Sequence, residues 1–65
     1  MRVEIISRAD FPDGLVDLCI LSFYKKKVYR YTYTLDSKDI ADKIEKLCQQ
    51  RRYKEAMSVL NKSKI

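Results

Sequence analysis

Apolar and polar residues alternate through the first half of the chain, and apolar residues recur at helical spacing through the second half. The alternation predicts three strands over residues 2–8, 15–24 and 28–35. Residues 18–21 are all apolar, so we expect the second strand to lie at the centre of the sheet. In the third strand one face carries Tyr29, Tyr31, Tyr33 and Leu35, and the other carries Val28, Arg30, Thr32 and Thr34.

Two short segments connect these strands. The sequence Phe11-Pro12-Asp13-Gly14 predicts a type I turn between the first two strands. A lysine run over 25–27 separates the second strand from the third. A three- or five-residue loop around Lys26 would align Cys19, Leu21 and Phe23 with the tyrosines, whereas a two-residue turn would align Ile20, Ser22 and Tyr24 with them. We expect the odd-numbered loop, because it stacks an apolar column against an aromatic one.

The second half of the chain predicts two helices. Asp36 or Ser37 is suited to cap the first helix, whose apolar positions run from Ile40 to Cys48. Residues 49–52 contain no apolar side chain and predict a break. A second helix is expected to start near Tyr53 and to bury a stripe that ends at Leu60, while residues 61–65 are expected to fray.

These elements predict a single small α+β domain over residues 1–65, in which a three-stranded antiparallel meander is followed by two helices packed on one sheet face. The helices are expected to cover the face that bears Cys19, Leu21, Phe23 and the tyrosines. The open face would then carry Val16, Leu18, Ile20 and Tyr24. Uncovered aliphatic side chains there would favour a protein partner or a homodimer.

Composition narrows the classes of function. The chain has 65 residues, and no apolar run approaches the roughly 18 residues that a membrane span requires. The start of the chain lacks the apolar stretch of a secretory signal, so we expect a cytoplasmic protein with reduced cysteines, although the spacing of Cys19 and Cys48 leaves a bridge between them open. There is no histidine, no Cys-x-x-Cys pair and no glycine-rich phosphate loop, so we expect no catalytic residues, no metal and no cofactor.

The net charge of +5 is distributed unevenly. One basic cluster contains Lys25, Lys26, Lys27 and Arg30 without an acidic residue, and a second contains Arg51, Arg52 and Lys54. Both fall at predicted loops, where binding residues are often found. Such clusters suit contacts with phosphate groups, although loops are also charged simply for solubility.

The column formed by Tyr29, Tyr31 and Tyr33 has two interpretations. It can serve as an aromatic platform for bases, as in sheet-based RNA readers. It can instead form the sheet face beneath the helices. We favour the core interpretation, because the opposite face of the same strand is mainly polar.

The central hairpin resembles the KTSC domain, a module of similar length that is named after the C-terminus of some lysyl-tRNA synthetases and occurs alone in bacterial and phage proteins. The resemblance covers roughly residues 18–57 and depends on Cys19-x-Leu21-x-Phe23, the lysine turn and Tyr29-Arg30-Tyr31, followed by a helix, a break and Tyr53. The family usually has glycine in the hairpin turn and before the last aromatic residue, where this chain has Lys26 and Arg52. The resemblance implies a module suspected of binding RNA.

The sequence therefore predicts a small nonenzymatic module that binds nucleic acid, RNA slightly ahead of DNA, through its basic loops. The alternative is a protein-interaction module or a homodimer, such as a small phage or bacterial effector.

Overall fold

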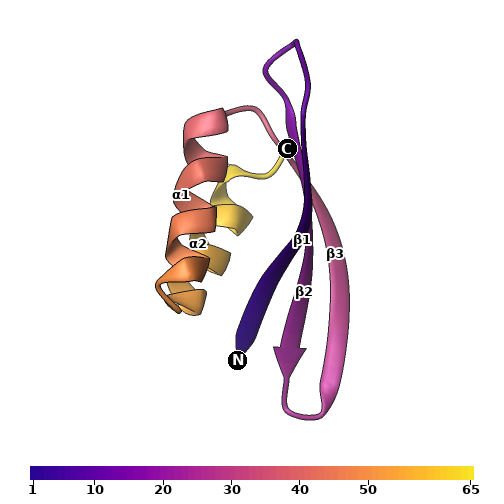
Figure 1. The fold of residues 1–65 in the computed structure, drawn as a ribbon, viewed down its shortest axis with the longest axis vertical. Helices are drawn as coiled ribbons and strands as arrows, with labels where there is room; N and C mark the ends of the chain where they lie inside the picture. The colour runs from indigo at the N-terminus through magenta and orange to yellow at the C-terminus, as the bar shows by residue number, and fades with distance from the viewer.

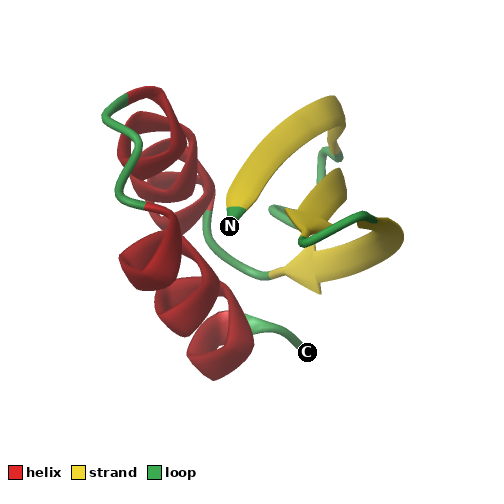
Figure 2. Ribbon diagram, turned by 90° about the horizontal axis from the view of Figure 1, so that it is seen from below, coloured by secondary structure: helices red, strands yellow, loops and turns green.

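The computed structural model describes all residues 1–65 and contains five elements (Figure 1). They are β1 (Arg2–Asp10), β2 (Val16–Tyr24), β3 (Lys27–Leu35), α1 (Lys38–Gln49) and α2 (Tyr53–Ser63). The strands form an antiparallel sheet in the order β1-β2-β3. Both helices lie side by side on one face of this sheet (Figure 2). The predicted α+β meander with two helices on one face is confirmed.

The turn between β1 and β2 forms where the sequence predicts it. The Gly14 amide donates to the Phe11 carbonyl at 3.0 Å, and the Asp13 carboxylate accepts from the Leu15 amide at 3.0 Å. Gly14 has a φ of +92°, a backbone conformation in which a side chain would be strained. The single glycine of the chain therefore stands where the turn requires one.

The register between β2 and β3 differs from the predicted one. Tyr24 pairs with Lys27, so the connection is a two-residue turn of Lys25 and Lys26. Tyr29, Tyr31 and Tyr33 consequently lie opposite Ser22, Ile20 and Leu18. This register turns Val16, Leu18 and Ile20 toward the helices and keeps the carboxylate of Asp17, on the other face of β2, out of the core.

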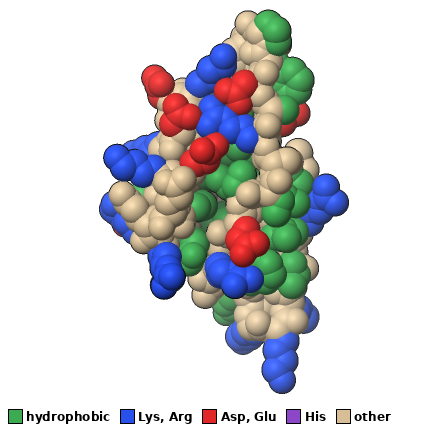
Figure 3. Space-filling view, in the orientation of Figure 1, with side chains coloured by type: hydrophobic (Ala, Val, Ile, Leu, Met, Phe, Trp, Pro, Cys, Tyr) green, Lys and Arg blue, Asp and Glu red, His purple; other side chains and the backbone are tan.

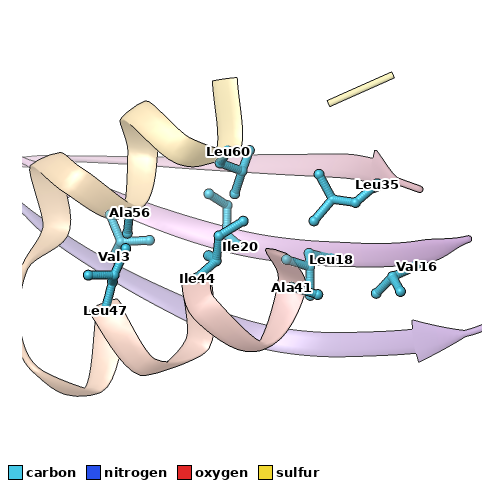
Figure 4. Packing of buried hydrophobic residues seen from close by; sticks show 10 residues of the cluster. All are labelled: Val3, Val16, Leu18, Ile20, Leu35, Ala41, Ile44, Leu47, Ala56 and Leu60. Atoms are coloured by element: carbon cyan, nitrogen blue, oxygen red, sulfur yellow. The ribbon is translucent and has the colours of Figure 1, made fainter. Parts of the chain in front are cut away.

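The hydrophobic core lies between this face and the helices (Figure 4). Its buried members are Val3, Val16, Leu18, Ile20 and Leu35 from the sheet, Ala41, Ile44 and Leu47 from α1, and Ala56 and Leu60 from α2. The prediction that Val16, Leu18 and Ile20 line an open face is therefore wrong, since their exposed fraction is 0%. They are unavailable as a partner surface, and of that predicted set only Tyr24 is exposed.

The helix ends follow from local chemistry. Ser37 caps α1, and its hydroxyl accepts from the Ile40 amide at 3.3 Å, as predicted. At the other end, the Arg51 amide donates to the Cys48 carbonyl and the Arg52 amide donates to the Leu47 carbonyl. These two bonds form a Schellman motif, which places Arg51 in a left-handed conformation with a φ of 60°.

The prediction that residues 61–65 fray is wrong. Helix α2 continues to Ser63, and the following residue, Lys64, forms an isolated antiparallel bridge with Leu35. The Ile65 amide donates to the Thr34 carbonyl at 2.9 Å. These bonds satisfy backbone groups on the outer edge of β3 and hold the end of the chain against the sheet.

Candidate nucleic-acid interface

The two predicted basic clusters lie at the same end of the molecule. The molecule measures 38 × 19 × 18 Å; the β2–β3 turn lies at one end of its long axis, and the α1–α2 turn lies in the same half, short of that end (Figure 1). The N-terminus lies between them when the molecule is seen from this end (Figure 2). The antiparallel topology explains the arrangement, because α1 runs toward the end where β2 also finishes.

The lysines of this end are free of ion pairs. All five ion pairs of the protein involve Arg2, Arg8 or Arg52, and none involves a lysine. Lys25, Lys26 and Lys27 are exposed at the hairpin tip, and Lys54 is exposed in the first turn of α2. Their ammonium groups are therefore available to an anionic ligand.

The predicted arginines are placed less favourably. Arg52 donates to both carboxylate oxygens of Glu55, at 3.0 and 2.5 Å, which offsets its charge. Arg30 lies on the opposite sheet face from the tyrosines, and its Nε donates to the sulfur of Cys19 at 3.3 Å. Arg51 is exposed and has no ion pair. Of the two arginines in the helix turn, Arg51 is therefore the one whose charge is not offset by a carboxylate.

The sheet extends beyond the helices at this end, so its last residues are uncovered on the helix-side face (Figure 1). Tyr24 is 53% exposed, and Tyr29 and Tyr31 are each 41% exposed. Tyr33 lies further along β3, packs against the core and has its pKa raised by burial. The core interpretation of the tyrosine column is thus correct for Tyr33 and wrong for Tyr29 and Tyr31, which stay exposed on the edge strand β3 although their β2 partners Ser22 and Ile20 are buried.

A surface pocket of about 500 Å³ lies at the hairpin tip. Its lining consists of Tyr24, Lys25, Lys26, Lys27 and Tyr29, and we refer to it as the hairpin pocket. The ammonium group of Lys25 lies 5.5 Å from the centre of the Tyr24 ring. The Tyr29 ring stacks on that of Tyr31, with centroids 6.4 Å apart and an interplanar angle of 23°. Aromatic faces and free cations therefore share one small surface.

Sequence reasoning missed two parts of this basic end. Tyr24 belongs with the lysines, a placement that depends on the two-residue turn. On the helices, a second pocket of about 300 Å³ is lined by Lys43, Lys46, Leu47, Gln50 and Arg52. Lys43 and Lys46 follow the ordinary polar pattern of an amphipathic helix, which does not indicate a binding surface. Of the charged residues in this lining, only Arg52 belongs to a basic cluster that the sequence predicts.

Carboxylates concentrate at the other end of the molecule. Asp10 and Asp13 lie at the β1–β2 turn, and Asp36 and Asp39 lie where α1 begins, next to that turn. Figure 3 shows most of the visible Asp and Glu side chains in this upper part. At the basic end, Glu4 and Glu55 are each paired with an arginine. The end that carries the hairpin therefore has a stronger positive charge than the net value suggests.

The two cysteines, whose pairing the sequence leaves open, are free thiols in different environments. A hydrogen bond from Arg30 lowers the pKa of Cys19, whereas burial raises the pKa of Cys48. Cys19 is 7% exposed, although it lies on the uncovered sheet face, because the side chains of Arg30 and Thr32 lie over it. Neither thiol lies in the hairpin pocket.

Lys25 occupies an unfavourable backbone conformation in this turn. Its φ is 56°, and Lys26 has no positive φ, which is the pattern of a type II′ turn with its usual glycine replaced. We expect Lys25→Gly to raise the free energy of unfolding by about 0.5–1 kcal/mol, because relief of the left-handed strain exceeds the added entropy of the unfolded chain. Urea unfolding measures this.

The matched control for this prediction is Lys26→Gly, which removes the same charge from the same turn. It should lower stability slightly, since glycine only adds flexibility at a negative φ. Equal urea concentrations at the midpoint of unfolding for the two variants would show that the backbone of Lys25 is not strained.

Neither α1 nor α2 combines the length and the apolar character that a membrane-spanning helix requires. The structure also contains no group of three or more His, Cys, Asp or Glu side chains that could hold a metal ion. Comparison with family models, curated proteins and solved structures finds no match to this chain.

Proposed function

We propose that this protein is a nonenzymatic nucleic-acid-binding module whose contact surface is its basic end. The observation that carries the proposal is the hairpin pocket, where three lysines without ion pairs stand beside exposed tyrosine rings. Lysines without carboxylate partners can replace the counterions of phosphate groups, which favours binding by releasing those ions. Arg51 and Lys54 at the helix turn provide a second contact along the same end of the molecule.

Backbone strain at the basic end supports the proposal. The two non-glycine residues with a positive φ are Lys25 and Arg51, one in each basic cluster. Glycine is the residue that such positions favour for stability. Costly conformations tend to persist where a side chain has a role in function. The resemblance of the hairpin to the KTSC domain favours RNA over DNA as the ligand.

Fluorescence anisotropy with labelled RNA and DNA oligonucleotides at low salt tests the proposal. We expect binding whose affinity falls steeply with salt, because each neutralised phosphate of a single strand contributes a slope of about −0.7 to the logarithmic plot. The double variant Lys26→Ser, Lys27→Ser should bind at least roughly tenfold more weakly and reduce that slope by about 1.4.

The control is the double variant Lys38→Ser, Lys62→Ser, which removes the same charge away from the hairpin tip, at the start of α1 and the end of α2. It should change the affinity by less than about threefold, since distant charges are screened by salt. No binding at low salt, or an equal loss in both variants, would contradict a defined basic interface.

A further inference from the structure

We propose that the hairpin pocket holds an unpaired base of a single-stranded nucleic acid, with a tyrosine ring against the base and lysines on the flanking phosphates. This inference rests on the proposed function and specifies its ligand. It starts from the exposure of three aromatic rings. Tyr24, Tyr29 and Tyr31 are exposed on the helix-side face of the sheet, toward the hairpin tip.

The register brings cations and aromatic rings onto the same face. Tyr24 lies directly opposite Lys27, and Tyr29 is the next residue on that face of β3. Lys27 is therefore adjacent to both rings, and Lys25 lies against the Tyr24 ring. A base in contact with either ring would place its sugar and phosphates beside ammonium groups.

The shape and packing of the site also suit a base. The pocket volume of about 500 Å³ falls within the range of roughly 300–1,000 Å³ that is typical of small-ligand sites. The Tyr29 and Tyr31 rings already stack on each other, so Tyr31 supports Tyr29 in its present orientation. A supported ring loses less side-chain entropy when a ligand binds than a freely rotating ring does.

These features favour a single strand over a duplex. The bases of a duplex are stacked on one another, so a tyrosine ring cannot contact their faces unless the duplex opens. In a single strand each base can stack on an aromatic side chain, with little dependence on sequence. An acidic peptide would satisfy the lysines, but it offers no flat ring for Tyr24 and Tyr29 to stack on.

The test compares four ligands for the full chain by fluorescence anisotropy or by competition: a ten-nucleotide oligouridine, a duplex of equal length, an abasic strand of equal length and polyglutamate. We expect the oligouridine to bind at least roughly tenfold more tightly than the other three. The double variant Tyr24→Leu, Tyr29→Leu should weaken oligouridine binding by about tenfold or more and leave the salt slope unchanged. It should leave abasic-strand binding unchanged.

Phe23→Leu is the matched control, because Phe23 belongs to the same hairpin and lies on the opposite sheet face, beneath Arg2. It should leave all four affinities unchanged, and circular dichroism of each variant checks that the sheet is intact. A second readout is the intrinsic tyrosine fluorescence, which should decrease when oligouridine binds and should not decrease with the abasic strand.

The outcomes separate this inference from the proposed function. If the lysine variants weaken binding while the tyrosine variant does not, or if duplex and abasic strands bind as tightly as oligouridine, the basic interface stands and the base site is wrong. If polyglutamate binds most tightly, the partner is an acidic protein and both are wrong. If no ligand binds at low salt, both are again wrong.

Discussion

Replacing Ile20 with aspartate should unfold the protein, whereas the same change at the next residue, Leu21, should leave it folded. Ile20 is fully buried beneath the helices, so a carboxylate there has no polar partner and no access to water. The cost exceeds about 4 kcal/mol, which is comparable to the whole stability expected of a domain of this size. Leu21 is only partly buried on the open face opposite Arg30, and its replacement should cost about 1 kcal/mol.

Circular dichroism at 25 °C distinguishes the two variants directly. The milder variants Ile20→Ala and Leu21→Ala allow the same comparison in folded proteins. We expect Ile20→Ala to lower the free energy of unfolding by about 2–5 kcal/mol and Leu21→Ala to lower it by less than half of that. If the Leu21 variant unfolds and the Ile20 variant stays folded, the result would support the alternative register, in which Cys19, Leu21 and Phe23 face the helices.

Replacing Arg8 with methionine should lower the free energy of unfolding by about 1–2 kcal/mol and the melting temperature by roughly 5–15 °C. Arg8 binds three carboxylates, two of which, Asp42 and Glu45, join β1 to α1. It donates to Asp10 at 2.7 and 2.9 Å, to Asp42 at 2.7 Å and to Glu45 at 2.8 Å. Its removal leaves these three carboxylates close together without a cation. The magnitude is modest because Asp42 is 66% exposed and its attraction is screened by solvent.

The effect of Arg8 should depend on pH and on salt. The hydrogen bonds from Arg8 lower the pKa of Asp10, so the stability from this pair is complete above the ordinary aspartate pKa and is lost as pH falls through the lowered value. The gap in melting temperature between the natural protein and the Arg8→Met variant should therefore shrink below about pH 4. It should also shrink at high salt, which weakens the attraction in one protein and the repulsion in the other.

Arg2→Met is the control for this experiment. Arg2 forms a single 3.5 Å pair with Glu4, and both side chains are at least half exposed. Its loss should change stability by less than about 0.5 kcal/mol. A gap for Arg8→Met that is independent of pH and salt would assign the role of Arg8 to packing of its aliphatic stem.

The elements were predictable because their signals are local. The turn around Gly14 and the cap at Ser37 depend on residues within a few positions of each other, and both form as predicted. The register of β2 and β3 had no such signal. Because β2 is apolar on both faces, its pattern did not decide which face the helices cover. A two-residue turn of lysines also lacks the glycine or asparagine by which such turns are recognised.

The candidate site was predictable in part for the same reason. The charges of Lys25, Lys26 and Lys27 are visible in the sequence. The exposure of Tyr29 and Tyr31 depends on how far the helices cover the edge strand β3, which is a property of the assembled layers. The Arg8 cluster joins residues that are 34 and 37 positions apart, so no local pattern could indicate it.

The separation of acidic and basic side chains along the 38 Å axis gives the molecule a permanent electric dipole. The field of a polyanion exerts a torque on this dipole, which turns the hairpin toward the ligand before any contact forms. A larger fraction of diffusional collisions then begins in a productive orientation than for a protein with the same net charge spread evenly.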